Sequence, residues 1–134
     1  MDLRLAFSHG ADCAALRSRA RDALGHSAGP ELVDDALLVI TELVENVVQH
    51  TGNGGELTVR RRDGALRIEV ADTSPHQPQV YGPDPRRIRG RGLMVVAAVS
   101  REWGTRAHDD GKVVWADLPL AGLPGPARAP DAIR

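Results

Sequence analysis

The chain has 134 residues, a net charge of −1 at pH 7 and 42% hydrophobic residues, which suits one soluble domain with one core. The charge balance excludes a strongly basic nucleic-acid surface, and no apolar run approaches the ~20 residues of a membrane span. The N-terminus lacks the apolar region of a signal peptide, and the single cysteine, Cys13, excludes an internal disulfide. We therefore expect a cytoplasmic protein without direct nucleic-acid or membrane contacts, in which Cys13 is a small core residue.

The first 52 residues predict one strand and two helices. Residues 3–7 alternate between apolar and other side chains, which indicates a strand, and residues 12–24 are typical of a helix. A longer helical pattern begins near Glu31, after Pro30 in the favoured first helical position, and ends before Gly52.

This long helix carries a polar ridge. Its apolar half consists of Val39, Ile40, Leu43, Val44, Val47 and Val48. Glu42, Asn46 and His50 recur every four residues, so they lie on one ridge at the border of that apolar half. The ridge predicts either the wall of a polar pocket or the ordinary polar flank of an amphipathic helix, and the helix alone leaves both open.

A hairpin follows, and its last residue is informative. Residues 56–62 and 65–72 alternate and are joined by Asp63-Gly64, a strong signal for a two-residue turn. Asp72 continues the phase of the apolar residues of the second strand, which would place its carboxylate on the core side of the sheet. A charge there needs a hydrogen-bond donor, such as an exocyclic amine of a ligand, unless the strand has ended and Asp72 caps a turn.

The next segment predicts a lid and an anion site. Residues 73–89 hold four prolines and end in a basic cluster that includes Arg89, which is typical of a lid or binding loop. Gly90-Arg91-Gly92-Leu93 then leads into an apolar helix predicted over Leu93 to Ser100. Glycines at a helix start let backbone N–H groups approach an anion closely, and the helix dipole favours negative charge.

The chain closes with a second hairpin and a tail. Residues 102–108 and 112–118 are predicted strands, joined by Asp110-Gly111. Residues 119–134 are rich in Pro, Gly and Ala and predict a flexible C-terminal tail.

Three motifs thus occur in a fixed order along the chain. They are Glu42-Leu-Val-Glu-Asn46-Val-Val-Gln-His50 on a helix, Val70-Ala-Asp72-Thr-Ser74 at a strand end, and Gly90-Arg91-Gly92-Leu93 at a helix start. This order resembles the nucleotide-binding domain of the GHKL ATPases, the group of gyrase, MutL and histidine kinases. The short length, with endings such as Arg101-Glu102-Trp103-Gly104 and Lys112-Val-Val-Trp115, is most similar to small anti-sigma-factor serine kinases of the RsbW type. The resemblance covers about residues 3–118.

The resemblance implies a fold and a function. The fold is the Bergerat, histidine-kinase-like ATPase fold: an α/β two-layer sandwich with helices packed on one face of a mixed, mostly antiparallel sheet, here over residues 1–118. The function is that of an ATP-binding regulatory protein, able to dimerise, that holds a sigma factor and phosphorylates an anti-sigma factor antagonist on serine. One alternative is a nucleotide-binding partner-switching module without phosphotransfer. Another is a detached histidine-kinase ATPase domain, which is less favoured because no phosphoacceptor helix precedes the domain.

The resemblance also implies roles for individual residues. Asn46 would ligate a Mg²⁺ that bridges the nucleotide phosphates, Glu42 would be the general base, and Asp72 would accept a hydrogen bond from the adenine amino group. Arg89 and the turn formed by Gly90, Arg91, Gly92 and Leu93 would wrap the phosphates. His50 and Ser74 complete the expected nucleotide-binding residues, with a helix-end hydrogen bond favoured for His50 over a part in the chemistry.

Two positions depart from the family pattern. The aspartate motif usually has a glycine where this chain has Ser74, whose side chain could crowd the base. The closing strand often carries a threonine near the adenine site, and its place falls to Val113, which would forfeit ~1 kcal/mol of hydrogen bonding. Both departures favour the module without phosphotransfer, whereas Glu42 favours the kinase.

Overall fold

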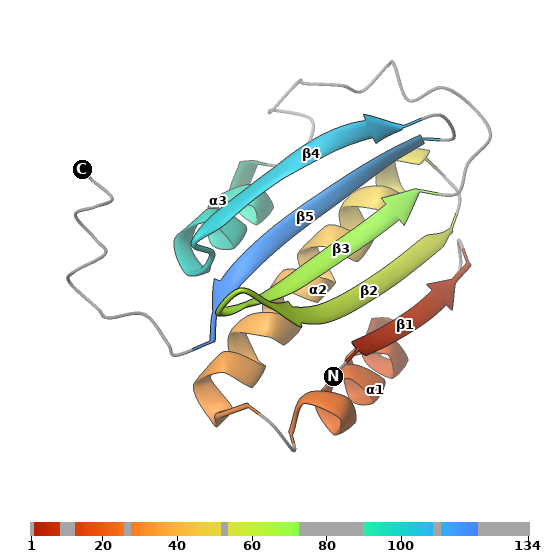
Figure 1. Cartoon of the computed structure of the whole chain (residues 1–134). Helices are drawn as coiled ribbons and strands as arrows, with labels where there is room; N and C mark the ends of the chain where they lie inside the picture. Colours follow the sequence, from red (N-terminus) through yellow and green to blue (C-terminus); the bar gives the residue numbers. More distant parts are fainter. Residues whose placement is uncertain are drawn as a thin grey trace, which may run out of the picture.

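The computed structural model describes residues 2–8, 13–25, 28–51, 54–72, 90–108 and 111–120. Within these residues a five-stranded sheet forms one layer and three helices form the other (Figure 1). In chain order the elements are β1 (Asp2–Phe7), α1 (Cys13–Leu24), α2 (Pro30–Thr51), β2 (Gly55–Arg62), β3 (Ala65–Asp72), α3 (Gly90–Val99), β4 (Glu102–His108) and β5 (Gly111–Pro119). The predicted α/β two-layer sandwich is confirmed.

The strand order in the sheet is β1-β2-β3-β5-β4, and each of the four pairings between described strands is antiparallel. The described sheet is therefore antiparallel, where a mixed and mostly antiparallel one was expected. Asp63 and Gly64 have φ angles of 48° and 77°, as the two central residues of a type I′ turn require. The hairpin predicted from this dipeptide is confirmed.

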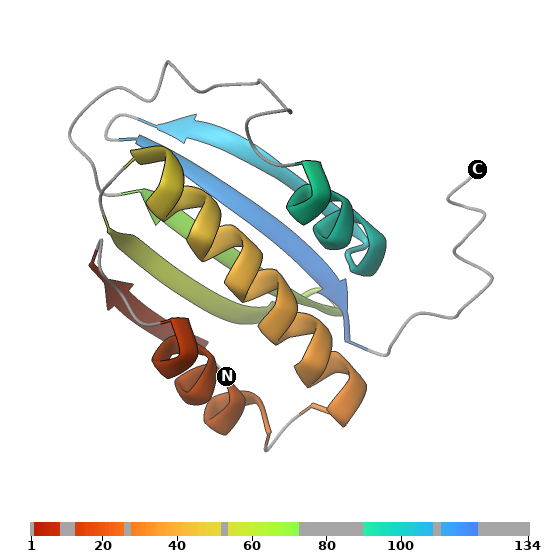
Figure 2. The same cartoon turned by 180° about the vertical axis from the view of Figure 1, so that it is seen from behind.

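The three helices cover one face of the sheet, with α2 across its middle (Figure 2). α2 buries Val39, Ile40, Leu43 and Val44 completely, as its periodicity predicted. The same face of the sheet supplies alternate apolar residues, among them Leu57, Val59, Ile68, Val70, Val114 and Ala116. Each of the leucine, isoleucine and valine side chains contributes about 1.5–3 kcal/mol when fully buried, so this interface holds the two layers together. Cys13 packs at the margin of the same core, as expected.

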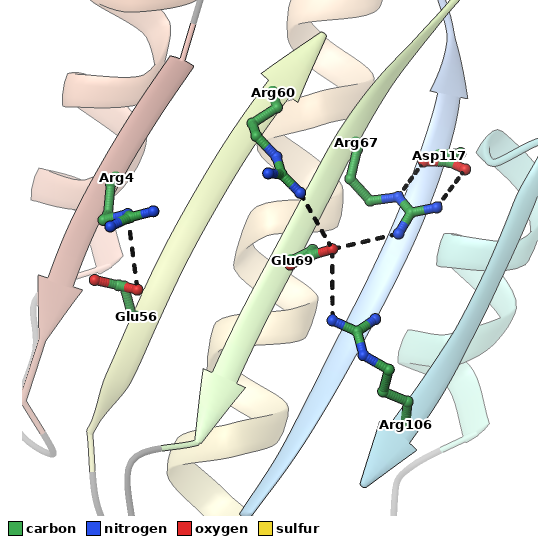
Figure 3. A network of polar contacts seen from close by, with 7 residues as sticks. All are labelled: Arg4, Glu56, Arg60, Arg67, Glu69, Arg106 and Asp117. Carbon is green, nitrogen blue, oxygen red and sulfur yellow. Dashed lines mark hydrogen bonds and ion pairs between the residues drawn. The ribbon is translucent and has the colours of Figure 1, made fainter. Parts of the chain in front are cut away.

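The opposite face of the sheet, which no described helix covers, carries a charged network centred on Arg67 (Figure 3). Its Nε and Nη2 donate to the two carboxylate oxygens of Asp117 at 2.5 and 3.0 Å, and Nη1 donates to Glu69 at 3.3 Å. The guanidinium also lies 4.3 Å from the ring centre of Trp115, which adds a cation–π contact. The hydrogen bond to Asp117 is the main reason why the pKa of Arg67 is raised above its ordinary value.

Candidate functional site

α2 places the polar ridge where the sequence predicted it. Glu42 and Asn46 are half-buried at the margin of the core, whereas Glu45 and Gln49 are exposed. Glu42 therefore lies one helical turn before Asn46, and both side chains are on the same side of the helix. His50 continues α2 as backbone, but its side chain lies outside the part of the chain that the structure describes.

Asp72 is buried, with 2% of its surface exposed. It is the last residue of β3 and is paired with Gly55 of β2, so the strand has not yet ended there. Its side chain follows the buried phase of Leu66, Ile68 and Val70 onto the helix-covered face. The prediction of a core-side carboxylate is confirmed.

Glycines flank Asp72 on both neighbouring strands. A Cβ on Gly55 would lie 2.1 Å from the carbonyl oxygen of Ala71 and 3.0 Å from the ring of Phe7. A Cβ on Gly111 would lie 2.9 Å from the backbone oxygen of Asp72 and 3.3 Å from its Oδ2, and the φ of Gly111 is +153°. Both glycines therefore let the backbone beside Asp72 pack closely, one of the usual reasons for glycine within a strand.

Lys112 of β5 lies on the same face of the sheet as Asp72 and in the same row, which here means the line of directly opposite residues that crosses neighbouring strands. The register pairs Ala71 with Val113, so the next pair towards the strand ends is Asp72 with Lys112. Because side chains alternate between the two faces, Val113 lies on the uncovered face with Ala71. Val113 therefore lies on the face opposite to that of Asp72, and the residue of β5 on the same face as Asp72 is Lys112.

Lys112 was not among the residues singled out from the sequence. It is half-buried, and burial lowers its pKa below the ordinary lysine value, while the charge of Asp72 offsets part of that shift. A signal for it was present, because Lys112 has the same phase as the buried residues Val114, Ala116 and Leu118. This is the same pattern that identified Asp72.

α3 begins at Gly90, so Gly90-Arg91-Gly92-Leu93 forms the first turn of this helix and not a loop that precedes it. The first four N–H groups of a helix have no acceptor within the helix and face outward at its positive end. This turn can therefore bind an anion through its backbone. The side chains of this turn lie outside the described residues, as do Ser74, Arg89 and the whole predicted lid, residues 73–89.

These elements share one face and, in part, one end of the sheet. The end of α2, the end of β3 and the start of β5 lie at the same end (Figures 1 and 2). α2 also contacts both β3 and α3. The fold therefore places the α2 ridge and the buried Asp72 on the helix-covered face, with α3 on the same face in contact with α2.

A comparison with protein families matches residues 9–118 to the histidine kinase-like ATPase domain. The chain belongs to this family. The GHKL resemblance is confirmed by this match, and the domain is an ATP-binding one. A comparison with curated protein sequences finds no match.

Within this histidine kinase-like ATPase domain, the described residues hold no group of three or more His, Cys, Asp or Glu side chains arranged to bind a metal. None of the described helices combines the length and apolar composition that crossing a membrane requires.

Proposed function

We propose that this ATP-binding domain is a protein serine kinase that acts on an anti-sigma factor antagonist and holds a sigma factor. The observation that carries the kinase part is the α2 ridge, where Glu42 lies one turn before Asn46 and both are half-buried beside the core. A base that is half-buried at a site margin can reach a substrate and is still held in place by its helix.

Mg²⁺ fits the donor set at this ridge. A hard cation takes oxygen ligands and retains several waters, so one carboxamide oxygen together with phosphate oxygens is sufficient. The Oδ1 of Asn46 would hold the ion, which supplies neutralising charge to the phosphates. Asp72 would accept a hydrogen bond from the adenine amine, and the first turn of α3 would donate backbone N–H groups to the phosphates.

Glu42 would take the proton of the attacking serine. As the serine Oγ forms its bond to the γ-phosphorus, its proton passes to the Glu42 carboxylate. The bond between that phosphorus and the oxygen that bridges to the β-phosphate breaks, and ADP leaves. Because Glu42 lies one turn away from Asn46, it can act as a base without entering the metal's ligand shell.

The sigma-factor and antagonist partners are supported by the resemblance to RsbW-type proteins. The order of the three motifs and the chain endings are the basis of that resemblance. A homodimer is part of the same proposal.

Incubation with γ-labelled ATP and candidate antagonists from the same genome tests the kinase proposal. We expect label on one antagonist, and no label on a version in which its acceptor serine is replaced by alanine. ATP binding without transfer to any candidate would instead support the partner-switching module. In that case binding of the antagonist, with and without ATP, would be the activity to measure.

A further inference from the structure

Lys112 is the only lysine among the 17 lysine and arginine residues of the chain. It lies on the helix-covered face of β5, where the following residues of the same phase, Val114, Ala116 and Leu118, are buried. A charged group on such a face is costly unless it is paired or hydrogen-bonded. Its position therefore indicates an interaction and not a solvated surface charge.

Lys112 and Asp72 form one polar patch. Side chains directly opposite each other on antiparallel strands have Cβ atoms about 4.5–5.5 Å apart, and the register places these two residues opposite each other. Burial lowers the pKa of Lys112, and the negative charge of Asp72 acts in the opposite direction, which fits two neighbouring groups of opposite charge. Gly55 and Gly111 carry no side chain beside Asp72 and let the neighbouring backbone approach closely, so Lys112 is the charged side chain that the register places next to Asp72.

We propose that Lys112 reads the nucleotide base together with Asp72. An ionised aspartate only accepts hydrogen bonds, and a lysine ammonium only donates them. Adenine offers the complementary pair, because its exocyclic amine donates while the ring nitrogens beside it accept. Asp72 accepts from the amine, and Lys112 donates to N1 or N7. This inference rests on ATP binding with the base at Asp72.

Two other roles for Lys112 make different predictions. A lysine in a nucleotide site can bind phosphate as a point charge. Here the phosphates are assigned to Asn46 and the first turn of α3, whereas Lys112 shares the row of Asp72. A lysine that only balances the charge of Asp72 would support binding without touching the base. Atomic substitutions in the base separate these roles.

The test measures binding of ATP, 1-deaza-ATP and 7-deaza-ATP by calorimetry to the wild-type chain and to Lys112→Met. Methionine keeps a long apolar stem and removes the ammonium. We expect wild type to bind one deaza analogue about tenfold more weakly than ATP, the loss of one charge-assisted hydrogen bond. Lys112→Met should bind ATP about as weakly as that analogue, and should no longer distinguish the two. Arg106→Met, which removes a positive charge from the uncovered face, should leave both affinities unchanged.

Two other outcomes of the calorimetry would overturn the inference that Lys112 reads the base. If Lys112→Met weakens all three nucleotides by the same factor, Lys112 balances charge or binds phosphate and does not read the base. If wild type binds both deaza analogues as tightly as ATP, no ring nitrogen is read. Both results leave ATP binding itself intact. Failure of wild type to bind ATP would overturn the proposed function as well.

A second measurement needs no variant, because the chain has a single lysine side chain. Acylation of Lys112 by an amine reagent is followed by mass spectrometry of its peptide, which distinguishes it from the N-terminal amine. We expect ATP and adenosine to protect Lys112, and tripolyphosphate not to. Protection by tripolyphosphate equal to that by ATP would assign Lys112 to the phosphates, and no protection by ATP would remove it from the site.

Discussion

Replacing Arg67 with methionine removes the centre of the charged network on the uncovered face of the sheet. The carboxylate of Asp117, whose side chain is 8% exposed, then loses both of its hydrogen bonds from the guanidinium. Removing one partner of a buried ion pair costs about 3–5 kcal/mol. Because Arg67 is itself 16% exposed and the face is open to water, we reduce this figure to about 2–3 kcal/mol. The lost stacking on Trp115 adds about 0.5–1 kcal/mol.

The assay is urea unfolding followed by circular dichroism, since the fluorescence of Trp115 would change with Arg67 itself. Arg4→Met is the matched control, because Arg4 and Glu56 are 3.9 Å apart and are 71% and 41% exposed. It should cost less than about 0.5 kcal/mol. The double variant Arg67→Met/Asp117→Leu should recover most of the loss, because no buried carboxylate then lacks a partner. An Arg67→Met variant no less stable than Arg4→Met would refute this reasoning.

Four further substitutions test the site, the turn between β2 and β3, and helix α2. Gly111→Ala should lower stability by about 1–3 kcal/mol and weaken ATP binding, because its Cβ meets the Asp72 backbone at a φ of +153°. Gly64→Ala, at a φ of +77° in open space, should cost about 1 kcal/mol in urea unfolding and leave ATP affinity unchanged; equal ATP affinities in both variants would contradict the account. Asp72→Asn should weaken ATP binding about tenfold or more in calorimetry, because a carboxamide donates as well as accepts, and unchanged affinity would remove Asp72 from base recognition. Burial, followed by the negative charges of Asp34 and Glu31, raises the pKa of Asp35. The folded chain therefore binds the Asp35 proton more tightly than the unfolded chain, and stability falls as pH rises from the ordinary to the raised pKa. Asp35→Asn should therefore be more stable at pH 7 by about 0.2–0.5 kcal/mol, with no gain below the ordinary pKa; an equal gain at both pH values would exclude this cause.

Periodicity in the sequence was sufficient for the parts of the fold that depend on local patterns. The 3.6-residue repeat of α2 predicted which side is buried and placed Glu42 and Asn46 at its border. The two-residue repeat of β3 predicted the buried Asp72, and Asp63-Gly64 predicted the hairpin turn. In each case one segment contains the whole signal, because a single face of one element decides the pattern.

The parts that were missed depend on how distant segments pair. Val113 was expected near Asp72 because the place of a residue in a motif does not reveal which face of the sheet its side chain occupies. Only the register between β3 and β5 identifies Lys112 as the residue on the face of Asp72. The Arg67–Asp117 pair joins residues 50 positions apart, on strands that are neighbours only because β5 lies between β3 and β4. The start of α3 was placed three residues late. Glycine is a poor helix former, yet the first helical turn makes few intrahelical bonds and tolerates it.

The most direct test of the proposed kinase compares Glu42→Ala with Asn46→Ala in two measurements, ATP affinity by calorimetry and label transfer to the serine of the antagonist. Both residues are half-buried on the same ridge of α2, so truncation should perturb the fold to a similar, small extent. Glu42→Ala should retain most ATP affinity and lose about 10²–10⁴-fold in transfer rate, because a positioned base contributes that much. Asn46→Ala should instead weaken Mg²⁺-dependent ATP binding itself. A Glu42→Ala protein that transfers phosphate at the wild-type rate would contradict the account.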